Sequence, residues 1–180
     1  MKTVVVYESM FGNTEHIARE IADGLTKSGS QTTTVGVGEV SPDDLAGSDL
    51  LVVGAPTHAF SMSRPSTRED AVRQGADPSH TAIGVREWLV TLDAALPVAA
   101  ERPRVAVFDT RVEMVRRLPG SAAKRAAKVL RTQGFVLLDR PTSFYVDDVR
   151  GPTISGESSR AHHWGSQLFD LARNQDRDAS

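Results

Sequence analysis

Residues 4–14 read Val4-Val5-Val6-Tyr7-Glu8-Ser9-Met10-Phe11-Gly12-Asn13-Thr14, and the change of pattern within them indicates a strand followed by a helix. Its apolar, β-branched beginning is typical of a buried strand. The following residues have helical spacing, with Ile17, Ile21 and Leu25 on one face. A strand-to-helix joint gathers unpaired backbone N–H groups at the positive end of the helix dipole, which favours an anion. Small polar residues are also common helix caps for local reasons, so spacing alone leaves both interpretations open.

The joint resembles the phosphate loop of flavodoxins and related FMN proteins, whose pattern is Thr/Ser-x-Thr/Ser-Gly-x-Thr. Ser9, Gly12 and Thr14 match this pattern, whereas Phe11 stands where flavodoxins usually carry a hydroxyl. The quinone-reductase branch of the same superfamily has Ser-Met-Tyr-Gly here, so an aromatic residue is compatible with the family. The resemblance implies that the FMN phosphate binds to Ser9, Met10, Phe11, Gly12, Asn13 and Thr14.

A second loop with a family pattern follows the apolar run 49–54, which predicts a buried strand. Gly54, Pro56 and Thr57 resemble the Gly-x-Pro-Thr segment that precedes an aromatic residue in the second flavin loop of the family. The resemblance implies that the flavin ring is contacted by Pro56, Thr57, His58, Ala59 and Phe60. In flavodoxins a glycine peptide in this loop stabilises the one-electron reduced flavin. No glycine stands at 57–60, so the resemblance implies that this state is weakly stabilised here. His58 is either a hydrogen-bond partner or proton relay for the flavin, or an exposed loop histidine.

The third loop follows a predicted strand at 104–108. There the family places its last flavin-contacting segment, which implies a role for Asp109, Thr110 and Arg111. We expect Arg64 and Arg111 to lie near the ring and to raise its two-electron potential.

The remaining pattern alternates strands and helices, which requires a parallel sheet covered on both faces. We expect helices at 41–45, 88–96 (closed by Pro97), 121–131 and 157–172, and a fifth strand from 135 to 146 that is interrupted at 139–141. Together with the resemblance, this predicts an α/β protein with a flavodoxin-like, three-layer α/β/α sandwich. Its five-stranded parallel sheet has the order 2-1-3-4-5. We expect one domain over residues 1–173, with a frayed tail at 174–180.

Composition excludes several classes of function. The 180 residues include no cysteine, which excludes disulfides, iron–sulfur ligation and cysteine nucleophiles. The net charge of -2 and the absence of a basic block do not support nucleic-acid binding. The histidines are scattered, so we expect no metal site. No apolar run is long enough for a membrane span, and the chain begins with a strand rather than a signal peptide, so we expect a cytoplasmic protein.

We therefore predict an FMN-binding redox protein that transfers electrons through its flavin. No catalytic side chain is assigned, and the redox partner and oligomeric state are left open. One alternative is an FMN-dependent NAD(P)H:quinone oxidoreductase acting on a small-molecule quinone; another is an interaction module that has lost FMN. The polar segment 61–84 is either a lid or partner surface beside the flavin, or a mobile insertion with solvated arginines.

Overall fold

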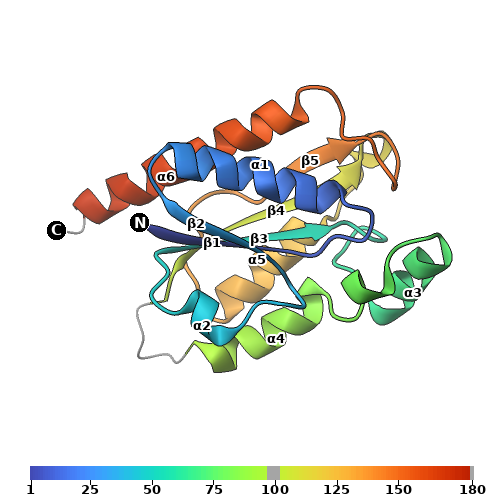
Figure 1. Cartoon of the computed structure of the whole chain (residues 1–180), viewed down its shortest axis with the longest axis horizontal. Coiled ribbons are helices and arrows are strands. Elements are labelled where there is room, and N and C mark those ends of the chain that lie inside the picture. The colour runs from blue at the N-terminus through green and yellow to red at the C-terminus, as the bar shows by residue number, and fades with distance from the viewer. Residues whose placement is uncertain (97–101, 179–180) are drawn as a thin grey trace.

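The computed structural model describes residues 1–96 and 102–178, and its centre is a five-stranded parallel sheet between two layers of helices (Figure 1). The strand order is β2-β1-β3-β4-β5, which confirms the predicted topology. The strands are β1 (Lys2–Tyr7), β2 (Gln31–Gly36), β3 (Leu50–Pro56), β4 (Arg104–Val112) and β5 (Thr142–Val146).

The helices divide between the two faces of the sheet. Helices α1 (Asn13–Lys27) and α6 (Glu157–Asp178) cover one face, and α2 (Pro42–Leu45), α4 (Val85–Ala95) and α5 (Ala122–Thr132) lie on the other (Figure 1). The remaining elements are α3 (Pro65–Arg73) and two short 3₁₀ turns, η1 (Pro78–His80) and η2 (Glu113–Val115). None of the helices described is long and apolar enough to cross a membrane.

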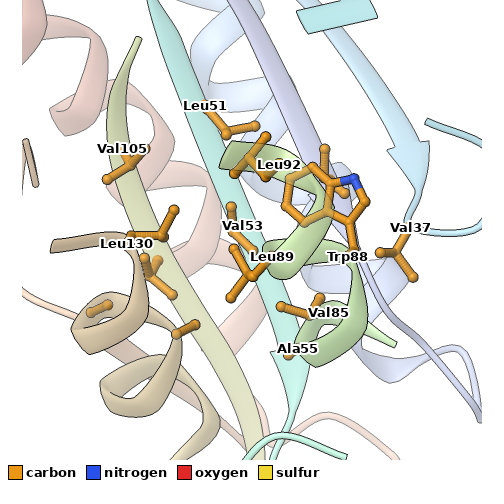
Figure 2. Close-up of a cluster of buried hydrophobic side chains, with 14 of the residues drawn as sticks. Val37, Leu51, Val53, Ala55, Val85, Trp88, Leu89, Leu92, Val105 and Leu130 are labelled. Atoms are coloured by element: carbon orange, nitrogen blue, oxygen red, sulfur yellow. The ribbon is translucent and has the colours of Figure 1, made fainter. Parts of the chain in front are cut away.

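The core has one apolar cluster on each side of the sheet, because the central strands are buried on both faces. Figure 2 shows the cluster under α4, where Trp88, Leu89 and Leu92 point towards Leu51 and Val53 of β3. Trp88 is therefore a packing residue, as its helical spacing predicts.

The other cluster contains three aromatic rings packed edge to face. The ring centroids of Phe108 and Phe144 are 5.9 Å apart, and that of Trp164 lies 6.3 Å from Phe108 and 5.9 Å from Phe144. Phe108 also lies over Gly54 of β3, where a Cβ atom would come within 2.1 Å of the ring. Gly54 is therefore required by this close approach of two strands.

Three predicted boundaries are wrong. Strand β4 continues to Val112 because residues 109–112 pair with β5, so Asp109, Thr110 and Arg111 belong to a strand and not to a loop. The fifth strand is confined to Thr142–Val146, and the segment 135–138 contributes only an isolated bridge between Leu137 and Val105. Helix α6 reaches Asp178, since no glycine or proline follows Ala172 to end it. The predicted stop at Pro97 lies outside the described residues.

The segment 61–84 is more ordered than its sequence indicates, because it contains α3 and η1. Arg68 is buried, and its guanidinium donates to the Thr81 carbonyl (2.9 Å) and the Ser63 hydroxyl (3.0 Å). It also lies 3.1 Å from a Glu87 carboxylate oxygen. One arginine of this segment is thus an internal anchor rather than a solvated side chain.

Candidate functional site

The loop between β1 and α1 presents unpaired donors at the N-terminal end of a long helix. Within residues 1–96 and 102–178, the backbone N–H groups from Ser9 to Thr14 form no hydrogen bond. The Ser9 hydroxyl is also buried and has no partner there. Gly12 has φ of 84° at the N-cap, a left-handed conformation that favours glycine. These donors and the helix dipole form an anion-binding geometry.

The loop between β1 and α1 packs against the segment 61–84. Met10 is buried and clusters with Ala71 and Ala76, and Phe11 packs against the same cluster. The Arg150 guanidinium lies 6.0 Å from the centre of the Phe11 ring. Phe11 consequently contributes to a wall of the neighbouring cavity.

That cavity has a volume of about 180 Å³ and lies at the carboxyl ends of β1, β3 and β4. It brings together most of the residues that the family resemblance implies, from all three loops. Its lining consists of Ser9, Met10, Phe11, Asn13, Thr14, Pro56, Thr57, His58, Ala59, Thr110, Arg111, Val112, Val146 and Val149.

Three of the implied residues do not line the cavity: Gly12, Phe60 and Asp109. Asp109 is completely buried, and its Oδ2 accepts hydrogen bonds from the Thr57 hydroxyl (2.9 Å) and the Ala123 N–H (3.0 Å). These bonds direct the Asp109 carboxylate towards the second loop and the start of α5, whereas Thr110 and Arg111 line the cavity. Asp109 therefore ties the second loop to α5.

Thr110 connects two of the loops directly. Its hydroxyl lies 2.7 Å from that of Thr14, and both side chains are buried. The sequence analysis missed three further lining residues, Val112, Val146 and Val149. Only the pairing of β4 with β5 brings Val112 and Val146 side by side.

Residues 58–61 form a two-residue hairpin at the rim of the cavity. The His58 N–H donates to the Ser61 carbonyl (2.8 Å), and the Ser61 N–H donates to the His58 carbonyl (3.0 Å). Ala59 and Phe60 have φ values of 45° and 63°, in a turn that usually contains glycine or asparagine. The backbone here is strained, and Phe60 extends outward with 44% of its surface exposed.

His58 faces the cavity as a neutral imidazole. Its burial lowers the pKa of the ring below its ordinary value, and the positive charge of Arg68 lowers this pKa further. Such a ring has one N–H donor and one acceptor nitrogen at neutral pH.

The two arginines expected near a flavin ring occupy different places. Arg111 lines the cavity, and its guanidinium donates to the carbonyls of Val115 (2.6 Å) and Leu118 (3.3 Å). Arg64 lies just before α3 and does not line the cavity. Of these two arginines, it is Arg111 that places a fixed positive charge at this site.

Glu8 is a buried carboxyl that sequence analysis did not single out. Its Oε2 accepts a hydrogen bond from the Val85 N–H (2.8 Å) at the start of α4, while Oε1 is buried without a partner. Burial raises the pKa of Glu8, although hydrogen bonding from Ser63 and Val85 and the charge of Arg68 oppose this shift. Glu8 thus joins the end of β1 to the other side of the sheet.

Comparison with known proteins relates this arrangement to one family. A family model described as Flavodoxin matches residues 5–72. A flavodoxin of Clostridium beijerinckii is 42% identical over 50 residues, which is 28% of this chain and 36% of that protein. The chain thus matches only about a third of that relative's length.

Solved structures resemble the chain over nearly all of its length. A flavodoxin from the domain Archaea is 19% identical and superposes with a TM-score of 0.66, covering 96% of this chain and 99% of that one. A cysteine-to-alanine mutant of a Pseudomonas aeruginosa flavodoxin is 11% identical, with a TM-score of 0.68 and the same coverage. The rubredoxin oxygen:oxidoreductase of Desulfovibrio gigas is 16% identical with a TM-score of 0.68, and the match covers 96% of this chain and 36% of that one. At these identities the structures establish a shared fold.

Proposed function

We propose that the chain is a flavodoxin-type protein that binds FMN in the cavity between β1, β3 and β4 and transfers electrons through it. Bound FMN would supply the redox chemistry, because its ring system stores electrons without help from protein side chains. The protein would supply binding, orientation and electrostatics.

One observation carries this proposal: the unpaired backbone N–H groups from Ser9 to Thr14, with the partnerless Ser9 hydroxyl beside them. Buried polar groups without partners are rare in folded proteins, and a bound phosphate would satisfy several of these at once. Phe11 stands at a position where the family pattern has a hydroxyl-bearing residue, so one donor is missing. The backbone donors are still present, because they do not depend on side-chain identity. The residues present therefore fit the phosphate of FMN.

The rest of the cavity suits an uncharged ring with polar edges. Apolar walls from Met10, Phe11 and Val112 would exclude water, and neutral His58 would offer one donor and one acceptor. Arg111 would hold a positive charge near the ring and favour negative charge on it. The volume of about 180 Å³ is below the roughly 300–1,000 Å³ of most enclosed ligand sites, so FMN would remain partly in solvent, open to a redox partner.

The test is a titration of the purified protein with FMN, followed by flavin absorbance and fluorescence. We expect saturable binding, and Ser9→Ala should weaken it by roughly 2- to 10-fold, the effect of one lost hydrogen bond. Thr32→Val is the matched control, because the Thr32 hydroxyl is also buried without a partner but lies in β2, outside the cavity lining. This control should bind FMN like the wild type. Failure of the wild-type protein to take up FMN would refute the proposal and favour an interaction module.

A further inference from the structure

A second depression adjoins the proposed FMN cavity and is lined by Arg64, Arg86 and Arg125, with no acidic residue in its lining. We call it the arginine pocket; its volume is about 520 Å³. Ala59 lines both this pocket and the proposed FMN cavity, so the two adjoin at the strained hairpin 58–61.

The three arginines are not paired with acidic groups in the part of the chain that the structure describes. Among the described residues, none of the three forms an ion pair with a carboxylate. The guanidinium of Arg86 is held by uncharged groups: it donates to the carbonyls of Ser63 and Met62, each at 2.8 Å, and to the Ser61 hydroxyl at 3.1 Å. These bonds fix its orientation and leave its charge in place.

Three cations around one depression repel one another unless an anion lies between them. Guanidinium groups are suited to an oxyanion, because their planar donors match the geometry of phosphate. In Arg86 the Nε and Nη2 donors bond to the protein, which leaves Nη1 for an anion. The arginines come from three separate elements, near α3, on α4 and on α5, and converge on a concave surface rather than a flat patch. A small molecule fits this shape better than the broad surface of a protein does.

We propose that the arginine pocket binds the phosphate group of a small molecule, held next to the flavin cavity. Nucleotides and inorganic polyphosphates share this chemistry. The relevance of such a ligand to electron transfer rests on the proposed function, whereas the binding of phosphate rests only on the arginines.

The test is calorimetric titration of the protein, with and without FMN, using inorganic pyrophosphate and NADPH as probes at low salt. The double variant Arg64→Ala/Arg125→Ala should bind pyrophosphate at least about tenfold more weakly than wild type. Arg131→Ala is the matched control: Arg131 is exposed on α5 like Arg125, but it does not line the pocket. The affinity of this control variant for pyrophosphate should stay within about twofold of the wild-type value. The affinity of the wild-type protein for both probes should fall as the salt concentration rises.

The proposal is overturned if the wild type binds neither probe at millimolar concentration, or if the control loses as much affinity as the double variant. It is also overturned if a polyglutamate peptide binds through the same arginines while pyrophosphate does not, since the surface would then serve an acidic protein. Binding of NADPH but not pyrophosphate, lost in the double variant, would support a nucleotide; equal binding would support any polyphosphate. Arginine-dependent binding in a protein that takes up no FMN would sustain this proposal and refute the proposed function.

Discussion

Replacing Gly54 by alanine tests whether this glycine serves packing rather than the flavin loop in which its sequence motif places it. In the structure Gly54 lies within β3, and an added Cβ would meet Cζ, Cε1 and Cε2 of Phe108 at 2.1, 2.4 and 2.8 Å. Ordinary carbon contacts are about 3.5–4.0 Å, so the ring would have to move by about 1.4 Å. Phe108 is completely buried and packs against Phe144 and Trp164, so a movement of its ring would disturb this aromatic cluster.

Overpacking of this kind typically costs about 1–3 kcal/mol, and the size of the overlap places Gly54→Ala at the upper end. For a chain of this length, a loss of about 3 kcal/mol lowers Tm by roughly 6–12 °C. In a Phe108→Leu background the cost should fall below about 1 kcal/mol, because leucine has no atoms at the Cε and Cζ positions. The expected coupling between the two positions is therefore about 2 kcal/mol.

The assay is urea unfolding of the wild type, both single variants and the double variant. Gly36→Ala in β2 is the control, since its Cβ would meet nothing closer than 3.7 Å and its stability should change by less than about 1 kcal/mol. If Gly54→Ala costs the same in both backgrounds, the Phe108 ring is not the obstacle and the packing argument is refuted.

Three further predictions concern the loops around the cavity. Because burial raises the pKa of Glu8, the folded state binds the proton of this carboxyl more tightly than the unfolded chain does, and the wild type should lose stability as pH rises from about 4.5 through the raised pKa. Glu8→Gln should remove this loss. Urea-stability curves of the two proteins that run parallel between pH 4 and 8 would contradict the prediction. Thr14→Val should cost about 1–3 kcal/mol in urea unfolding, because it leaves the buried Thr110 hydroxyl unpaired. The double variant Thr14→Val/Thr110→Val should recover much of this loss, and a double variant as unstable as Thr14→Val, or less stable, would argue against the hydroxyl pair. Ala59→Gly should raise Tm and Ala59→Val should lower it, each by an amount that corresponds to about 1 kcal/mol, because a φ of 45° disfavours a side chain. If neither substitution changes the calorimetric Tm, the turn is not strained.

The parts of the fold that could be predicted are those in which local pattern and burial agree. The apolar runs at 4–6 and 50–53 are buried in β1 and β3, and the helical stripe of Ile17, Ile21 and Leu25 is buried in α1. The strand order came from family resemblance, because alternation alone specifies a parallel sheet but not the order of its strands.

The end of β4 could not be predicted because its residues are polar. Asp109, Thr110 and Arg111 look like a loop in sequence, yet they are buried and paired with β5. Each polar group has a specific reason to be there: Asp109 accepts from Thr57 and α5, Thr110 pairs with Thr14, and Arg111 donates to backbone carbonyls. These partners are distant in sequence, so tertiary contacts override the local pattern.

Glu8 was missed for a related reason. A carboxylate directly after a strand is typical of an exposed loop, and nothing in its neighbours indicates that it reaches the N–H of Val85, far along the chain. The arginine pocket could not be predicted from the sequence either, because Arg64, Arg86 and Arg125 are far apart along the chain and the fold brings them together. Sequence spacing identifies loops, whereas the charge around a site depends on which loops meet.

The charge around the proposed site is positive, whereas the net charge of the whole chain is -2. At the proposed FMN cavity, Arg111 is held in place and the arginine pocket adjoins it. The nearby carboxyl of Glu8 is buried with a raised pKa, so it opposes these cations less than an exposed glutamate would. A field of this sign favours electrons on a bound flavin and attracts anionic ligands to its edge. Arg111 would thus raise the reduction potential of a bound flavin, whereas the arginine pocket would attract the anionic molecule that approaches. Loss of Arg64 and Arg125 should weaken that attraction and leave the effect of Arg111 in place.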